Sequence, residues 1–256
     1  MVSKFFKRFY LLIVLTFLYA PIVTLIVYSF NESKTRAVWS GFSLKWYGQL
    51  FQNPEIMQAL YVTLTIAVLA SCFATLIGTL GAIGIYGMNK MPKAIFLNVS
   101  YLPILTPEIV TGISLMIMFT FVQLPLGFFT MLLAHITFNI PYVLYSVLPK
   151  LKQMNPHTYE AALDLGSTPS YALRRIIVPE ILPGIITGAI LSFTLSLDDF
   201  VISFFTTQDV QNLSILVFSM ARRGVSPTIN ALSALMFVTI ILLLFIVNRR
   251  ASLVEG

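Results

Sequence analysis

The stretch KLKQMNPHTYEAALDLGSTPSYALRRIIVPEILP, residues Lys150–Pro183, decides how the rest of this chain is interpreted. It is polar, and it lies between two strongly apolar runs. Most connections in the chain are short, so a polar insert of this length is expected to have a structure and a role of its own.

Two helix starts lie within this stretch, at Asn155-Pro156 and at Thr168-Pro169. Each pair offers an N-cap side chain followed by a proline at the first helical position. The first helix is predicted over residues 156–165 and ends at Gly166, because glycine tolerates the positive φ that is common after a helix. The second is predicted over residues 169–178, with an end near Pro179. Two short helices at a sharp angle would form a protrusion outside the membrane.

Composition indicates an all-α polytopic membrane protein. Of the 256 residues, 57% are hydrophobic and only 10% are charged, and the mean hydropathy is +0.88. The net charge of +6 does not require a nucleic-acid partner, because most of the excess falls in short loops, where it sets topology. Cys72 is the only cysteine, which excludes a disulfide framework within the chain and a thiolate metal site.

The chain is predicted to be one transmembrane domain, residues 1–256, that contacts membrane lipid. The predicted spans cover about residues 9–30, 59–88, 94–122, 128–148, 184–206 and 229–247, and the polar loop covers 150–183. The uncharged run at 9–30 is too long for the apolar region of a signal peptide and indicates a first membrane helix. Four glycines, Gly78, Gly81, Gly84 and Gly87, form a ridge that favours close helix packing. Apolar spacing within 208–228 predicts a short amphipathic helix.

The distribution of lysine and arginine predicts cytoplasmic N- and C-termini. With that orientation, eleven basic residues face the cytoplasm and five face outward, which is a positive-inside bias. The inner set is Lys4, Lys7, Arg8, Lys90, Lys93, Lys150, Lys152, Arg174, Arg175, Arg249 and Arg250. The outer set is Lys34, Arg36, Lys45, Arg222 and Arg223. The same orientation places the polar loop in the cytoplasm.

Three acidic residues fall within predicted spans, where a carboxylate usually faces a water-filled cavity or a partner. Glu108 and the pair Asp198-Asp199 each lie about 14 residues from the inner end of a span, or about 21 Å at 1.5 Å per residue. With Tyr101 and Phe200 nearby, they could hold an amine by charge and cation–π contact. The alternative is structural: the aspartates mark a helix break facing water, and Glu108 caps a helix that restarts after Pro107.

Sequence patterns of enzymes are weak. No GxxxxGK[ST] phosphate loop occurs, so the chain is expected not to hydrolyse ATP itself. Gly112-Ile113-Ser114 lacks the closing glycine of a serine-hydrolase motif, and His135 has no HExxH partner. We therefore expect no catalytic residues, no cofactor and no metal.

One motif in the polar stretch carries a family resemblance. Glu160-Ala161-Ala162, Gly166, Ile176 and Val178-Pro179 resemble the EAA loop of bacterial ABC importer membrane subunits, with Val178 in place of the usual leucine. The resemblance implies a type I importer permease in which this loop is a coupling helix that docks into a cytoplasmic ATPase. The residues implied in that contact are Glu160, Ala161, Ala162, Asp164 and Gly166.

The resemblance extends along most of the chain, including LPILTPEIVTGISL and LSLDDFVISFF, to permease subunits of spermidine/putrescine importers. It implies a subunit of the bacterial inner membrane that imports polyamines by alternating access. The implied partners are a second homologous permease subunit, two copies of an ATP-binding subunit and a periplasmic polyamine-binding protein. Two alternatives stay open: an ABC permease for a different small solute, and an ion-coupled secondary transporter.

Overall fold

The computed structural model describes residues 2–34, 38–155, 157–223 and 227–254, with side chains for 6–34, 38–155, 157–222, 227–239 and 241. These residues are helical apart from connections and one isolated β-bridge between Asn31 and Phe42, which confirms the all-α prediction. The chain forms two compact units. Unit 1 comprises residues 1–57 and 216–256, and unit 2 comprises residues 58–215.

Unit 1 contains α1 (Val2–Ser29), α2 (Lys45–Gln52) and α12 (Pro227–Val254), and α12 packs against both other helices. The loop between α1 and α2 is held by side-chain hydrogen bonds. The indole Nε1 of Trp46 donates to the carbonyl of Asn31 at 2.6 Å, and the hydroxyls of Ser29 and Tyr47 lie 2.7 Å apart. Trp46 is only 3% exposed, so it stabilises this loop from inside rather than lying at an aqueous interface.

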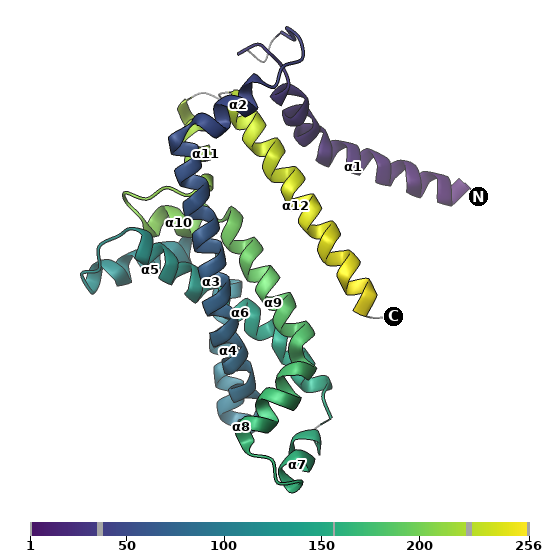
Figure 1. Ribbon diagram of the computed structural model, residues 1–256, viewed down its shortest axis with the longest axis vertical. Coiled ribbons are helices and arrows are strands. Elements are labelled where there is room, and N and C mark those ends of the chain that lie inside the picture. Colours follow the sequence, from purple (N-terminus) through teal and green to yellow (C-terminus); the bar gives the residue numbers. More distant parts are fainter. Residues whose placement is uncertain (1, 35–37, 156, 224–226, 255–256) are drawn as a thin grey trace. The chain divides into compact units, whose positions relative to one another are not determined.

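Unit 2 holds most of the remaining helices, and Figure 1 places α7 and α8 at one end of it and α5 and α10 toward the other. Two of its helices, α3 and α11, cross the boundary with unit 1. The elements are α3 (Pro54–Tyr86), α4 (Lys90–Leu105), α5 (Glu108–Phe121), α6 (Phe128–Gln153), α7 (His157–Asp164), α8 (Pro169–Ala172), the π-helical turn η1 (Leu173–Ile177), α9 (Val178–Asp198), α10 (Val201–Thr206) and α11 (Leu213–Arg223). The predicted amphipathic helix within 208–228 is α11.

Helix α6 is the centre of unit 2, because glycines on two neighbouring helices bring their backbones close to it. A Cβ at Gly78 of α3 would lie 2.8 Å from Val143 Cβ, and one at Gly184 of α9 would lie 2.9 Å from the carbonyl oxygen of Ser146. Gly84, by contrast, has open space around its Cβ position. The predicted glycine ridge is therefore used for close packing at Gly78 and not along its whole length.

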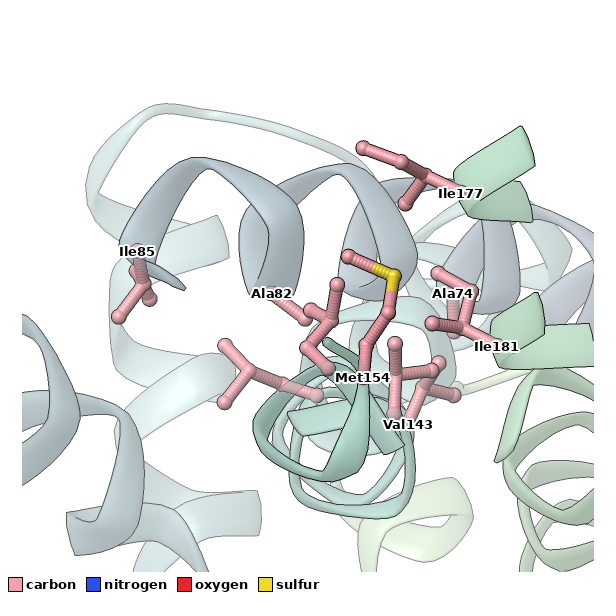
Figure 2. Packing of buried hydrophobic residues seen from close by; sticks show 10 residues of the cluster. Ala74, Ala82, Ile85, Val143, Met154, Ile177 and Ile181 are labelled. Carbon is pink, nitrogen blue, oxygen red and sulfur yellow. The ribbon is translucent and has the colours of Figure 1, made fainter. Parts of the chain in front are cut away.

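A buried apolar cluster joins the same three helices to η1 near the polar loop. Its members are Ala74, Ala82, Ile85, Val143, Leu144, Val147, Leu151, Met154, Ile177 and Ile181. Figure 2 shows Met154, the residue that follows α6, among residues of α3 and α9. The cluster ties the segment after α8 to the membrane helices.

Four helices among the described residues are long and apolar enough to cross a membrane: Phe6–Ser29, Pro54–Tyr86, Phe128–Gln153 and Pro169–Asp198. Helices α4 and α5 qualify as a fifth only together, and they meet at 107°. Within α12 the described apolar segment, Pro227–Thr239, is shorter than a span. Six spans stay a prediction.

Three of the predicted helix boundaries are wrong. The span expected over 94–122 is broken at Thr106-Pro107, because a residue before proline is driven into the extended conformation that Thr106 adopts, with ψ 140°. The span expected over 184–206 ends at Asp198 and restarts at Val201. The helix expected to stop near Pro179 instead continues to Asp198.

Candidate functional site

The protrusion begins with α7, and its ends are fixed by the residues expected from sequence. Asn155 Oδ1 accepts a hydrogen bond from the backbone N–H of His157 at 3.0 Å, which caps the helix start. At the other end Gly166 has φ +86°, its N–H donates to the carbonyl of Leu163, and the N–H of Ser167 donates to that of Ala162. These two bonds form a Schellman motif, which requires the positive φ of Gly166.

Helix α7 has one face that packs inward and one that is free for a partner. Ala162 is buried, and Tyr159 packs against the apolar cluster of α3, α6 and η1. Glu160, Ala161 and Asp164 are exposed. Glu160 also borders a cavity of about 450 Å³ between the protrusion and the adjoining ends of α3 and α6.

One helix joins the protrusion to the acidic residues. The helical segment Pro169–Asp198 has 30 residues and passes through α8, η1 and α9. Thr168 caps its start, because its Oγ1 accepts the N–H of Tyr171. The ring of Pro179 would normally clash with the carbonyl four residues earlier, and the wider π-helical turn just before it relieves that clash. Burial of Ile177 and Ile181 and the close contact at Gly184 stabilise the continuous helix.

Asp199 closes the break between α9 and α10. One carboxylate oxygen, Oδ2, accepts the backbone N–H of Ser203 at 2.8 Å, and Oδ1 accepts that of Ile202 at 3.3 Å. The carboxylate therefore caps the first turn of α10. The helix does break here, as the structural alternative from sequence predicted. Asp199 does not face water, however, because it is only 8% exposed.

A buried polar network surrounds Asp199. The hydroxyl of Ser203 donates to Asp199 Oδ2 at 2.9 Å, and His135 Nε2 of α6 lies 2.9 Å from the same hydroxyl oxygen. Asn212 Nδ2 donates to Ser203 Oγ at 2.8 Å and to the carbonyl of Asp199 at 3.0 Å. The backbone N–H of Leu213 donates to Thr63 Oγ1 of α3 at 2.8 Å. The network thus joins α3, α6, α9, α10 and the start of α11.

Serine, histidine and aspartate meet in this network, but the geometry does not match a catalytic triad. In a triad the histidine lies between the serine and the carboxylate and accepts the serine proton. Here Ser203 donates directly to Asp199, and His135 and Ser203 are both at most 1% exposed. The other hydrolase candidate, Ser114, is exposed on α5, whereas His135 bonds to Ser203.

Two acidic residues are exposed beside the network. Glu108, in the first turn of α5, and Asp198, the last residue of α9, are both exposed, and Glu108 lies within electrostatic reach of Asp198 and Asp199. Helix α5 packs against α10 at Gly112, where a Cβ would lie 3.1 Å from Phe205 and 3.4 Å from the carbonyl oxygen of Val201. Since Glu108 and Gly112 are four residues apart, they share a face of α5.

Aromatic pairs occur between α4 and α6 and at the start of α10 in unit 2. Tyr101 of α4 makes an edge-to-face contact with Tyr145 of α6, with ring centroids 5.3 Å apart. Phe200 lies 5.4 Å from Phe204 by the same measure. Tyr142 of α6 interacts electrostatically with Glu108. Sequence reasoning missed Tyr142 and Tyr145, since nothing in their spacing separates them from ordinary packing residues of an apolar helix.

The structure therefore divides the predicted site residues into two groups at opposite ends of one helix. Glu160, Ala161, Ala162, Asp164 and Gly166 lie together on the protrusion, whereas Asp198, Asp199 and Phe200 lie at the α9–α10 break with Glu108 within electrostatic reach. Tyr101 joins neither group, because its ring contacts Tyr145, which packs on the apolar cluster near the polar loop. The network residues His135, Ser203 and Asn212 were not predicted as site residues. A histidine in the middle of an apolar span was the one signal for them. Within the described residues, no group of three His, Cys, Asp or Glu side chains is arranged to hold a metal ion.

The chain is similar to known transport proteins along most of its length. The chain is 38% identical over 239 residues to the spermidine/putrescine transport system permease protein PotC of Escherichia coli (strain K12), covering 93% of this chain and 90% of that protein. It is 40% identical over 233 residues to the putrescine transport system permease protein PotI of the same strain, covering 88% and 83%.

A solved structure has the same fold. It is a bacterial ABC transporter involved in the import of the acidic polysaccharide alginate, and it matches with a TM-score of 0.72 at 18% identity over 98% of both chains. Residues 74–255 match the family model described as the binding-protein-dependent transport system inner membrane component. The chain therefore belongs to the family of inner-membrane components of binding-protein-dependent transport systems.

Proposed function

We propose that this chain is a permease subunit of an ATP-driven polyamine importer, and that Glu108 and Asp198 are the acidic groups that bind the amine along its path. The observation that carries the proposal is that two exposed carboxylates from different helices lie within electrostatic reach of each other, with Tyr142 near Glu108 and Phe200 next to Asp199. A carboxylate binds an ammonium by a charge-assisted hydrogen bond, and an aromatic face adds cation–π attraction. The names of the relatives, spermidine/putrescine and putrescine permeases, support the same substrate class.

The three predicted acidic residues have different roles in this proposal. Asp199 uses its carboxylate to cap α10 and accepts hydrogen bonds from buried groups, so it acts on the structure of the path. Glu108 and Asp198 are exposed and act on the substrate. Tyr101 and Phe200 are proposed to contribute aromatic faces along the path.

The protrusion is proposed as the contact with a separate cytoplasmic ATP-binding subunit. Its exposed residues Glu160, Ala161 and Asp164 form the docking face, and Gly166 and Ala162 hold the shape of that face. Force applied there would pass along the Pro169–Asp198 helix, which carries Asp198 at its far end. The 30 residues span about 45 Å at 1.5 Å per residue. Because they form one continuous helix, a tilt applied at the protrusion also tilts the end that carries Asp198. Alternating access is the expected result.

The assembled importer is proposed to contain two permease subunits, this chain and a homologue, with two ATP-binding subunits and a periplasmic binding protein. The orientation follows from the eleven basic residues assigned to the inner side against five on the outer side, which puts both termini and the protrusion in the cytoplasm. Co-purification of an ATP-binding subunit with the wild-type chain, and its loss on changing Glu160 and Asp164 together to Ala, tests this arrangement. Retention of the subunit by the double variant would contradict the docking face.

Uptake of labelled spermidine and putrescine tests the substrate, in cells that lack only this chain and receive it back on a plasmid. The double variant Glu108→Gln with Asp198→Asn should lower uptake at least about tenfold, because two charge-assisted contacts are lost. Asp209→Asn is the matched control, since Asp209 is an exposed acid in the connection after α10 and is outside the interacting carboxylates. Normal uptake by the double variant, at normal membrane levels, would refute the amine path. Uptake of neither amine by wild type would favour a different solute.

A further inference from the structure

We infer that His135 is a positioning residue: acting through Ser203 and Asp199, it holds α10 in place and thereby sets the relative position of Glu108 and Asp198. This inference rests on the proposed function for its meaning in transport. The structural part of the inference is that His135 controls the distance between the start of α5 and the end of α9. That part is supported by the buried network alone.

The donors and acceptors of the network determine the tautomer of His135. Ser203 has a single hydroxyl proton, which it donates to Asp199 Oδ2. Its oxygen therefore accepts from both remaining neighbours, Asn212 Nδ2 and His135 Nε2. His135 must carry a proton on Nε2 to donate, and its Nδ1 is buried without a hydrogen-bond partner among the described residues. The hydrogen bond to Ser203 is the shorter of two contacts of Nε2, which also lies 3.5 Å from Asp199 Oδ2.

Asn212 uses its whole side-chain amide in the same network. Its two N–H groups donate to Ser203 Oγ and to the carbonyl of Asp199, and its Oδ1 accepts the backbone N–H of Ile215 at 2.9 Å. The carbonyl of Asp199 is left without a helical partner by the break after α9, so Asn212 satisfies it. Ser203 Oγ thus has all of its hydrogen-bonding capacity filled, and loss of any one neighbour leaves a buried polar atom unsatisfied.

The network reaches the acidic pair through α10. Asp199 follows Asp198 directly, so fixing its carboxylate fixes the end of α9. Helix α10 in turn contacts α5 at Gly112, too closely for a larger side chain to fit without displacement. Glu108 lies one turn before Gly112 on the same face of α5. A shift of α10 away from α6 would therefore change the position of Glu108 relative to Asp198.

Helix α6 offers a matched control. Asn139 lies one turn after His135, is also fully buried, and donates from Nδ2 to Ser196 Oγ of α9 at 2.7 Å. This bond joins α6 to α9 without touching Asp199 or α10. A general loss of buried polar contacts would affect His135→Leu and Asn139→Leu alike, whereas positioning affects only the former.

The first measurement separates KM from the maximal rate of spermidine uptake in whole transporters. His135→Leu should raise KM roughly tenfold and leave the maximal rate within about twofold of the wild-type rate. A roughly tenfold rise in KM is the size expected when one hydrogen bond positions a charged group. His135→Gln should keep a KM near that of wild type, because the glutamine amide can donate from nearly the same place as Nε2. Asn139→Leu should leave KM unchanged. Equal KM values for His135→Leu and wild type, or an equal rise for Asn139→Leu, would overturn the inference.

The second measurement does not depend on the substrate. Glu108→Cys and Asp198→Cys are combined in a Cys72→Ala background and joined by a short bifunctional thiol reagent. Cross-linking should fall at least about threefold when His135→Leu is added and stay at its starting yield with His135→Gln or Asn139→Leu. Unchanged yield with His135→Leu would refute positioning even if wild type imports polyamines. A drop specific to His135→Leu, with no polyamine uptake by wild type, would keep the positioning role and reject the proposed substrate.

If His135→Leu does not accumulate, Ser203→Ala removes the same hydroxyl contact with a smaller change and carries the same expectations.

Discussion

The two ends of the Pro169–Asp198 helix are built in different ways. At the protrusion, Thr168, Gly166 and Asn155 make hydrogen bonds to residues no more than five positions away. At the α9–α10 break, His135 bonds to a residue 68 positions away, and the backbone N–H of Leu213 bonds to Thr63, 150 positions away. The outer face of the protrusion is exposed, whereas the hydrogen-bond network at the break is buried. A partner can therefore act on the first, while the second holds the internal geometry of the path.

The largest expected effect is a difference in stability between variants of two adjacent aspartates at the break, Asp199 and Asp198. Asp199→Ala removes the cap of α10 and leaves buried donors unsatisfied, so the free energy of unfolding should fall by about 3 kcal/mol. Asp198→Ala should change it by less than about 0.5 kcal/mol, since Asp198 is exposed. Thermal unfolding in detergent measures both variants. Equal losses would show that the break does not depend on the Asp199 carboxylate.

A smaller effect is expected where glycine is required by space. Gly78→Val would drive a side chain into Val143 and the carbonyl of Ile140, which should lower stability by about 2 kcal/mol. A Cβ at Gly84 on the same helix meets no described neighbour within 4 Å, so Gly84→Val serves as the control. Comparing the midpoints of thermal unfolding of Gly78→Val and Gly84→Val checks this prediction. No difference would mean that α3 does not pack on α6 as described.

At the protrusion, glycine is required by backbone conformation instead. A Cβ placed at Gly166 would meet no described atom within 4 Å beyond its chain neighbours, but its φ of +86° is costly for a branched residue. Gly166→Val should cost about 1–2 kcal/mol locally and uncouple ATP hydrolysis from uptake, whereas Gly166→Asn should be milder, because Asn tolerates positive φ. ATPase and uptake rates of the reconstituted importer check this. Full transport by Gly166→Val would count against the coupling role of α7.

The smallest effect is expected at the cap of the long helix. Thr168→Ala removes one side-chain bond to the N–H of Tyr171 and should cost about 1 kcal/mol. Because that end is exposed, hydrogen exchange of the amides of residues 170–172 should rise while the α9–α10 break is unaffected. Ser170→Ala, at an exposed neighbouring position, is the control. Faster exchange at Ser203 as well would mean that the two ends are less independent than described.

Much of the fold was predictable from hydropathy and local signals. The apolar runs correspond to α1, α3, α6 and α9, the turn at Gln123–Gly127 separates α5 from α6, and the motif with Gly166 forms the expected end of α7. The errors all fall at prolines or at buried polar residues. Pro107 breaks a helix, and Pro179 lies within one, although each proline is followed directly by a glutamate. The difference comes from tertiary packing, which stabilises the helix around Pro179 through Ile177, Ile181 and Gly184.

The sequence alone determined the all-α membrane class, the capped protrusion and the presence of acidic residues in apolar segments. Those properties depend on composition and on residues a few positions apart, where chain geometry leaves few alternatives. Only the tertiary structure decided that Asp199 is buried and Asp198 exposed, and that one helix runs from the protrusion at Pro169 to Asp198. Adjacent residues of the same type differ in this way because their surroundings are supplied by distant helices: α6 provides His135, and the segment before α11 provides Asn212.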